Sequence, residues 1–219
     1  MCGRFTQDYS WEDVHDYYNL TGPALNLRPS YNVAPTQTVH TIGAADAGRV
    51  LREARWGLIP GWWKKSLKEL PATFNARAET VAEKPMFRSA FRQRRCLVPA
   101  GGYYEWRGSG EAKQPYFIYR ADEAPLTLAG LWEVWRDPVS GEAVRSCTVL
   151  TTDANNLMRP IRSRMPVILE SGQFVAWMDQ GAADLPGPCR DDLLAYHAVS
   201  KDVGNVRNNA ATLREPIAA

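Results

Sequence analysis

The stretch that decides the fold is CLVPAGGYYEWRGSGEAKQPYFIYRADEAPLTLAGLWEVW, residues 96–135. It predicts successive short strands, rich in β-branched, aromatic and other apolar residues, at 96–100, 102–107, 116–120 and 126–135. The Gly-rich segment RGSGEAKQP, residues 107–115, is typical of a hairpin turn between the second and third strands. Because these strands follow one another with no helix between them, they favour antiparallel pairing.

The rest of the chain adds further strands and a few short helices. Further strands are expected at 39–42, 50–60 and 146–152. Irregular connections are expected at 21–37 and 61–74. The capping-box pattern at Ser10–Asp13 predicts a helix that runs to about Asn19. Other helices are expected at 78–94, 173–180 and 191–197. The predicted fold class is therefore α+β with mostly antiparallel strands.

Length and composition set the class of protein. A chain of 219 residues without repeat, low-complexity tract or linker is expected to form one domain over residues 1–219. With 45% apolar and 23% charged residues it has the composition of a soluble globular protein. We expect a cytoplasmic protein, because no signal sequence or membrane-spanning run is present. The four cysteines are far apart and show no ligand spacing, so we expect free thiols and no metal or cofactor.

A cysteine follows the initiator methionine directly, in MCGRFT. Chain ends are usually frayed, so Cys2 either packs by chance or carries chemistry. Enzymatic removal of Met1, which is general when the second residue is small, would leave an amine and a thiol on adjacent carbons. With reference pKa values of about 7.7–8.0 and about 8.5, both groups are expected to be partly deprotonated near neutral pH. Such a 1,2-aminothiol condenses with an aldehyde, first to a Schiff base and then to a thiazolidine ring.

Glu105 and Asn75 are candidate polar groups of a site. In a strand of period two, Tyr103, Glu105 and Arg107 share one face. A carboxylate that is desolvated among aromatic side chains has a raised pKa and can act as an acid or a base, whereas a solvated strand carboxylate does neither. Asn75, in FNARAET, either belongs to such a site or simply caps a loop.

Basic and aromatic residues form two clusters. RPIRSRMPVIL, residues 159–169, places three arginines around a turn, where they either bind phosphate oxygens or are solvated. GWWKK, residues 61–65, carries Trp62 and Trp63, which either stack on unpaired bases or fill a core. A net charge of +2 neither indicates nor excludes nucleic-acid binding. The histidines show no metal-ligand spacing and are His15, His40 and His197.

Several of these stretches occur in a recognisable order along the chain, together with others: MCGRF, YNVAPTQ, RWGLIPGWWK, NARAET, GGYYEW, RMPVIL and VSKDVGNVRNN. As a set they resemble the SOS response-associated peptidase family, and the resemblance covers nearly the whole chain. It implies a compact, barrel-like core of strands flanked by short helices. It also implies a protein that binds single-stranded DNA, or a junction with duplex, at an abasic site and shields the lesion with a thiazolidine cross-link to Cys2.

The resemblance assigns roles to individual residues. Cys2 would be the nucleophile, Asn75 would orient the chain terminus and the sugar, and Glu105 would shuttle protons. The arginines that would hold backbone phosphates are Arg4, Arg77 and Arg164. The residues that would stack on or wedge bases are Pro35, Trp62 and Trp63. The protein is expected to act as a monomer, and to associate with the nucleoid when it is bound to DNA.

One position departs from the family pattern. The stretch that matches RPIRSRMP normally has a histidine two residues before the arginine matched by Arg164, and this chain has Arg162 there. The family histidine would stabilise the sugar oxygen and assist proton transfer, which an arginine cannot do at neutral pH. If Arg162 points at Glu105, it lowers the pKa of that carboxyl. We therefore expect capture of the aldehyde to survive but to be slower, and its reversal to be slower still.

Two other functions fit an N-terminal cysteine in such a chain. It could be the nucleophile of an N-terminal-nucleophile peptidase or amidohydrolase, with its own amine as the base. In that case the enzyme would turn over an amide and would not require DNA, and self-removal of Met1 would be one such reaction. Alternatively, with the site disabled by Arg162, the protein would be a non-catalytic single-stranded DNA-binding module whose affinity falls steeply with salt. Cleavage of the abasic strand by β-elimination from the Schiff base is a possible side activity of the cross-linking enzyme.

Overall fold

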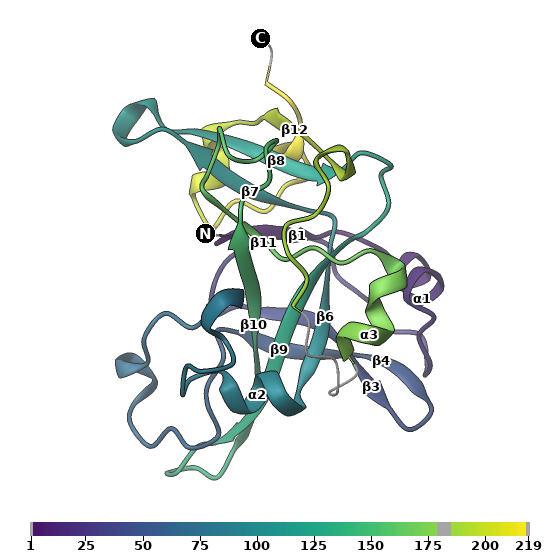
Figure 1. The fold of residues 1–219 in the computed structure, drawn as a ribbon, viewed down its shortest axis with the longest axis vertical. Coiled ribbons are helices and arrows are strands. Elements are labelled where there is room, and N and C mark those ends of the chain that lie inside the picture. Colours follow the sequence, from purple (N-terminus) through teal and green to yellow (C-terminus); the bar gives the residue numbers. More distant parts are fainter. Residues whose placement is uncertain (1, 179–184, 218–219) are drawn as a thin grey trace.

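A closed barrel of five strands forms the lower part of the molecule in Figure 1, a computed structural model that describes residues 2–178 and 185–217. Around the barrel, each strand pairs with the next and the last pairs with the first, in the order β10 (Ala143–Asp153), β4 (Gly48–Trp56), β3 (Thr38–Ala45), β6 (Arg95–Ala100) and β9 (Leu126–Arg136). Two short strands, β5 (Asn75–Arg77) and β11 (Arg164–Pro166), also pair with β10.

A second, five-stranded sheet lies above the barrel in Figure 1, with β1 at the junction. Its strand order is β12 (Leu194–Ala198), β8 (Gln114–Arg120), β7 (Gly102–Arg107), β1 (Phe5–Gln7) and β2 (Ser30–Val33). The first strand of the chain is therefore an interior strand of this sheet. This pairing fixes the N-terminal segment between the sheet and the barrel.

The packing of the barrel interior depends on a glycine in β9. A Cβ at Gly130 would lie 2.8 Å from a methyl group of Val98 and 3.0 Å from the sulfur of Cys96, both on the neighbouring strand β6. The register aligns Cys96 with Gly130, and Val98 with Leu128. The absence of a side chain at position 130 therefore leaves room for the larger side chains of β6 in a close-packed interior.

Short helices flank the strands: α1 (Trp11–Tyr18), α2 (Arg88–Gln93) and α3 (Phe174–Met178). As predicted, α1 begins with a reciprocal capping box, in which Ser10 Oγ accepts from Asp13 N and the Asp13 carboxylate accepts from Ser10 N. It ends at Asn19, which is left-handed with φ of 50°. Single 3₁₀ turns are found at η1 (Leu67–Glu69), η2 (Ala78–Thr80), η3 (Gly110–Ala112), η4 (Ser171–Gln173), η5 (Asp191–Leu193), η6 (Lys201–Gly204) and η7 (Ala211–Arg214). None of the helices described here is long and apolar enough to cross a membrane.

The predicted α+β class, the barrel-like core and the strand series of residues 96–135 are confirmed. Not every pairing is antiparallel, because β10 runs parallel to β4 and to β5. The strand expected at 50–60 ends at Trp56, where Gly57 turns the chain with φ of 129°. Within the segment expected to be irregular, residues 30–33 form β2, because they find a partner in β1.

Two helix predictions were wrong in extent or type. The helix expected at 78–94 is confined to α2, because Pro85 cannot continue a helix through the residues before it. Residues 191–197 form a 3₁₀ turn and then β12, because pairing with β8 overrides the local helical pattern. The helix expected at 173–180 is observed as α3, and residues 179–180 lie outside the described part of the chain.

Candidate active site: a cleft around Cys2

Cys2 is fully buried, which is unusual so close to a chain end. The segment that follows it runs beside β7: Tyr104 N donates to Arg4 O at 2.9 Å, and Phe5 is aligned with Tyr103. Because this pairing is antiparallel, residues before Arg4 lie toward Glu105 and the later part of β7. The position of Cys2 is therefore imposed by the sheet.

Asn75 holds the main chain of Cys2 from the barrel side. Its Nδ2 donates to Cys2 O at 2.7 Å, and its own strand, β5, is fixed by pairing with Val149 of β10. The Asn75 Oδ1 atom is buried and has no hydrogen-bond partner among the described residues. Asn75 is therefore more than a loop cap, because it joins the N-terminal segment to the barrel and keeps one acceptor available.

Glu105 is the buried carboxyl of the site, with 3% of its side chain exposed. Burial raises its pKa above the ordinary value, as expected for a desolvated carboxyl. Arg162 approaches it from the turn before β11, with Nε 3.8 Å from Glu105 Oε2, and this charge opposes the effect of burial. The side chain of Arg162 is about half exposed, at 48%, so water weakens the influence of its charge.

The Cys2 thiol is protonated in the folded protein. Burial, and secondarily the nearby Glu105 carboxyl, raise its pKa to about 12, while a hydrogen bond with the backbone of Arg4 acts in the opposite direction. The expectation of a partly ionised thiol concerned the chain without Met1, whereas in this structure, where Met1 precedes Cys2, burial raises the pKa of the thiol. Formation of a thiolate here requires a base, and Glu105 is the carboxyl beside it.

An open cleft of about 320 Å³ gives access to these groups. The residues that line it come from the N-terminal segment, the β7–β8 hairpin, the Arg162 turn and η6, and they are Gly3, Arg4, Glu105, Trp106, Lys113, Arg162 and Gly204. The guanidinium of Arg4 is held by Asn32 Oδ1 and Val203 O, each at 2.7 Å. Arg4 therefore presents a fixed positive charge at the cleft.

Arg77 and Arg164 lie outside this lining, on β5 and β11, which each pair with β10. Arg164 donates to both carboxylate oxygens of Glu79, at 2.7 and 2.8 Å, and to Asp153 at 2.8 Å. Its charge is therefore already compensated, and a phosphate would have to compete with two carboxylates for it. Arg77 is exposed at the end of β5 and has greater freedom to bind an anion.

The predicted base-contacting residues also lie outside the cleft lining. Trp62 is exposed at 52%, and its ring centroid is 6.0 Å from that of Trp63. Trp63 is half-buried and fixed in place, since its carbonyl accepts from Trp135 Nε1 at 2.7 Å. Pro35 is half-buried in a turn whose next residue, Thr36, has φ of 77°, a strained conformation for a β-branched residue.

Sequence reasoning missed two side chains of the cleft, Lys113 and Trp106. Lys113 Nζ lies 5.4 Å from the Trp106 ring centroid, and the guanidinium carbon of the predicted residue Arg4 lies 5.9 Å from it. The position of Lys113 just before β8, across the hairpin from Trp106, was the available signal. Within the described residues there is no group of His, Cys, Asp and Glu that could hold a metal ion.

Comparison with known proteins places the chain in a family. The model of the SOS response associated peptidase (SRAP) family matches residues 1–206. The abasic site processing protein YoqW of Bacillus subtilis is 38% identical, with 98% of this chain and 99% of that protein covered. The abasic site processing protein YedK of Escherichia coli is 32% identical over 99% of this chain and all of its own length. The chain therefore belongs to the SRAP family.

Solved structures agree with this assignment. A protein from Bacteroides thetaiotaomicron has a TM-score of 0.90 and 28% identity, covering 99% of this chain and all of its own. A protein from Bordetella bronchiseptica has a TM-score of 0.81 and 29% identity, covering 91% of this chain. The barrel and the sheet above it are thus found in experimentally determined relatives.

Proposed function

We propose that this protein processes abasic sites in DNA by covalent capture at Cys2 after Met1 has been removed. The observation that carries the proposal is a buried Cys2 whose main chain is held by the Asn75 amide and whose thiol is influenced by Glu105, a carboxyl that lines the adjoining cleft. The names of the relatives support the substrate, since YoqW and YedK are abasic site processing proteins. The substrate we propose is single-stranded DNA, or a junction with duplex, that carries an abasic site. We propose that the protein binds it as a monomer.

The chemistry runs in two condensation steps. The Cys2 amine attacks the aldehyde carbon of the open-chain sugar to give a carbinolamine, and protonated Glu105 donates the proton with which its hydroxyl leaves as water, which gives an iminium. The resulting Glu105 carboxylate then accepts the thiol proton, and the sulfur attacks the iminium carbon. As the new C–S bond forms, the π electrons of the C=N bond move to nitrogen, which gives a neutral thiazolidine. Because burial raises the pKa of Glu105, its protonated form can return the proton when the ring reopens.

The surroundings of the cleft suit a DNA backbone. Arg4 and Lys113 supply positive charge at the lining, and Arg77 is exposed farther out. The exposed face of Trp62 can stack on an unpaired base, while Trp63 anchors the loop. Arg164 plays a phosphate-binding role in this scheme only if DNA displaces one of its carboxylates.

Arg162 is the residue that distinguishes this site from the family pattern. Its Nε lies 3.8 Å from Glu105 and lowers the pKa of that carboxyl relative to an unpaired buried one. Reopening of the ring needs a protonated acid, so a lower pKa slows reversal more than formation. A long-lived cross-link is the expected result.

A denaturing gel tests the proposal. Mature protein, with loss of Met1 confirmed by intact mass, is mixed with a single-stranded oligonucleotide that carries one abasic site. The expected result is a shifted band that survives denaturation, requires the aldehyde and disappears in Cys2→Ala. No shifted band from the mature protein would contradict the proposal. Cleavage of a model peptide that depends on Cys2 would then indicate a peptidase, and salt-sensitive binding without an adduct would indicate a DNA-binding module.

A further inference from the structure

Tyr103 is a fully buried residue whose hydroxyl has no hydrogen-bond partner among the described residues. It lies on β7 two positions before Glu105, so the two side chains share one face of the strand. Its ring packs in the same cluster as Cys2 and Ile118. A buried hydroxyl without a partner destabilises a fold, whereas phenylalanine would fill the same space without that cost. The hydroxyl therefore calls for an explanation other than packing.

The groups around this hydroxyl belong to the reactive site. An ionised Cys2, Glu105 or Cys189 would each act on it electrostatically, with Cys2 exerting the largest influence of the three. Cys189 comes from the segment before η5, and its main chain is held by Asn155 Nδ2 at 3.1 Å. Burial keeps the pKa of Tyr103 well above its ordinary value, so the group stays protonated and acts as a donor, not as a base.

The reaction creates a charged acceptor in the same core cluster as this donor. Ring closure passes through a Cys2 thiolate, and burial holds the pKa of that thiol at about 12. The Arg162 side chain is paired with Glu105 and remains about half exposed to solvent. A phenolic O–H that meets the sulfur only when it is ionised would stabilise the thiolate, because hydrogen bonds to charged acceptors are the strong ones.

We propose that the Tyr103 hydroxyl is a positioning group that donates a hydrogen bond to the Cys2 sulfur as the thiolate forms and attacks the iminium carbon. The inference rests on the proposed cross-linking function and adds a residue to it. Glu105 removes the thiol proton, the hydroxyl keeps its own proton throughout, and the sulfur electron pair becomes the C–S bond. The energy lost by an unpartnered hydroxyl in the free protein is thus recovered during ring closure.

Tyr103→Phe separates this role from a structural one. Borohydride trapping measures Schiff-base formation. The amount of adduct that borohydride can no longer reduce measures ring closure. Fluorescence anisotropy measures DNA binding. We expect trapping and binding to stay within about twofold, while ring closure at pH 7 slows about tenfold, which corresponds to about 1.4 kcal/mol. The defect should shrink as the pH rises toward the pKa of the thiol, because the thiolate then needs less assistance.

The neighbouring Tyr104 supplies the matched control. Its hydroxyl donates to Tyr31 O at 2.9 Å and belongs to a different core cluster. Tyr104→Phe should lower the melting temperature and leave ring closure unchanged, whereas Tyr103→Phe should melt at or above the wild-type temperature. Wild-type ring closure and pH profile in Tyr103→Phe would overturn the inference, as would loss of trapping or binding in that variant. Absence of any Cys2-dependent adduct in the wild type would instead overturn the proposed function.

Discussion

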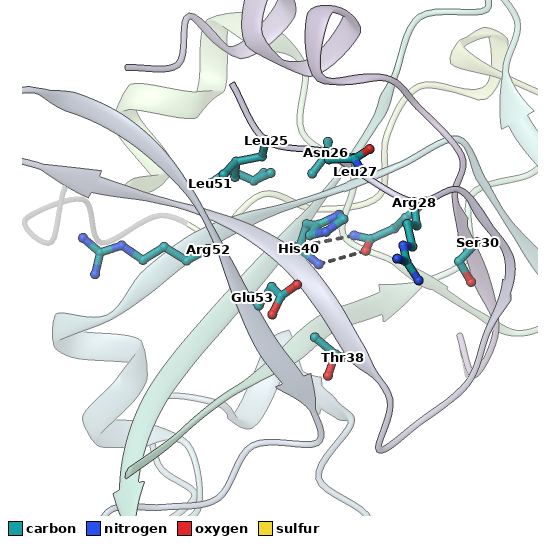
Figure 2. Close-up of a pocket in the computed structure, with 11 residues that line it drawn as sticks. Leu25, Asn26, Leu27, Arg28, Ser30, Thr38, His40, Leu51, Arg52 and Glu53 are labelled. Atoms are coloured by element: carbon teal, nitrogen blue, oxygen red, sulfur yellow. Dashed lines mark hydrogen bonds between the residues drawn. The ribbon is translucent and has the colours of Figure 1, made fainter. Parts of the chain in front are cut away.

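The cleft beside Cys2 and a second hollow, lined by Gln7 of β1 and by residues of β3 and β4, show how differently two polar depressions can be built. The hollow in Figure 2 is larger, at about 500 Å³ against 320 Å³, and lies where the segment 25–30 crosses β3 and β4. It also contains a possible base and a carboxylate, since His40 is aligned with Glu53. By size and residue types alone, the hollow would be the better candidate for a site.

The two regions differ in how their polar groups are satisfied. In the hollow, buried Gln7 has all its partners, accepting from His40 N and donating to His40 O and Pro99 O, as the dashed lines to His40 in Figure 2 illustrate. Glu53 is exposed. Glu105, which lines the cleft, is buried, and among the residues around Cys2 the Asn75 Oδ1 and Tyr103 Oη atoms are buried without partners in the described structure. Unsatisfied and desolvated groups, not volume, distinguish the proposed site from the hollow.

The largest expected effect is that of the buried carboxylate. Glu105→Gln should slow cross-link formation by about 10²–10⁴-fold, because the thiol loses its base. The matched change in the hollow, Glu53→Gln, should leave the rate within about twofold. Single-turnover kinetics on an abasic oligonucleotide would measure both. Equal rates in the two variants would remove the distinction between the regions.

A smaller decrease in the rate of cross-link formation is expected when the hydrogen bond from Asn75 to the Cys2 main chain is removed. Asn75→Ala removes the 2.7 Å hydrogen bond to Cys2 O and should slow the reaction by about ten- to a hundredfold. Asn26→Ala, in the hollow, is the control and should have no effect. A rate for Asn75→Ala that matches this control would show that the N-terminal segment is positioned without it.

Much of this architecture could be predicted, since the strands of residues 96–135 carry a clear alternating pattern. The strand β12 could not, because its pattern was helical and only its pairing with β8 decides its conformation. The site was predictable only through the family resemblance. Periodicity placed Tyr103 on the face of Glu105, but no sequence pattern shows that its hydroxyl lacks a partner or that the Cys2 thiol is held protonated by burial.

Restoring the family residue should change the rates more modestly. Arg162→His replaces a fixed cation near Glu105 with a group that can exchange a proton, and should speed formation by several-fold and reversal by about tenfold. Arg52→His, at the hollow, should change neither. Reversal is measured by chasing the cross-link with excess unlabelled abasic DNA. Unchanged rates in Arg162→His would mean that the arginine does not limit proton transfer.

The smallest expected effects are on folding stability. Glu105 and His40 should make stability depend on pH in opposite directions. Burial raises the pKa of Glu105, so the folded state binds that proton more tightly and stability falls as the pH rises above 4.5. Glu105→Gln should therefore be more stable than the wild type at neutral pH and lose that advantage in acid.

Burial lowers the pKa of His40, so the stability of the folded protein falls as the pH drops below 6.5. In that pH range His40→Gln should be more stable than the wild type. Urea unfolding across the pH range would reveal both trends, and parallel curves would contradict the assigned burial effects.

The most direct test of the central claim is mass spectrometry of the cross-link after nuclease and protease digestion. The account predicts one modified peptide, the N-terminal one, with the sugar carbon bonded to both the amine and the sulfur of Cys2. That peptide should resist borohydride and carry no free thiol. A sugar attached to a lysine, or to an amine beside a thiol that still alkylates, would contradict thiazolidine capture at Cys2.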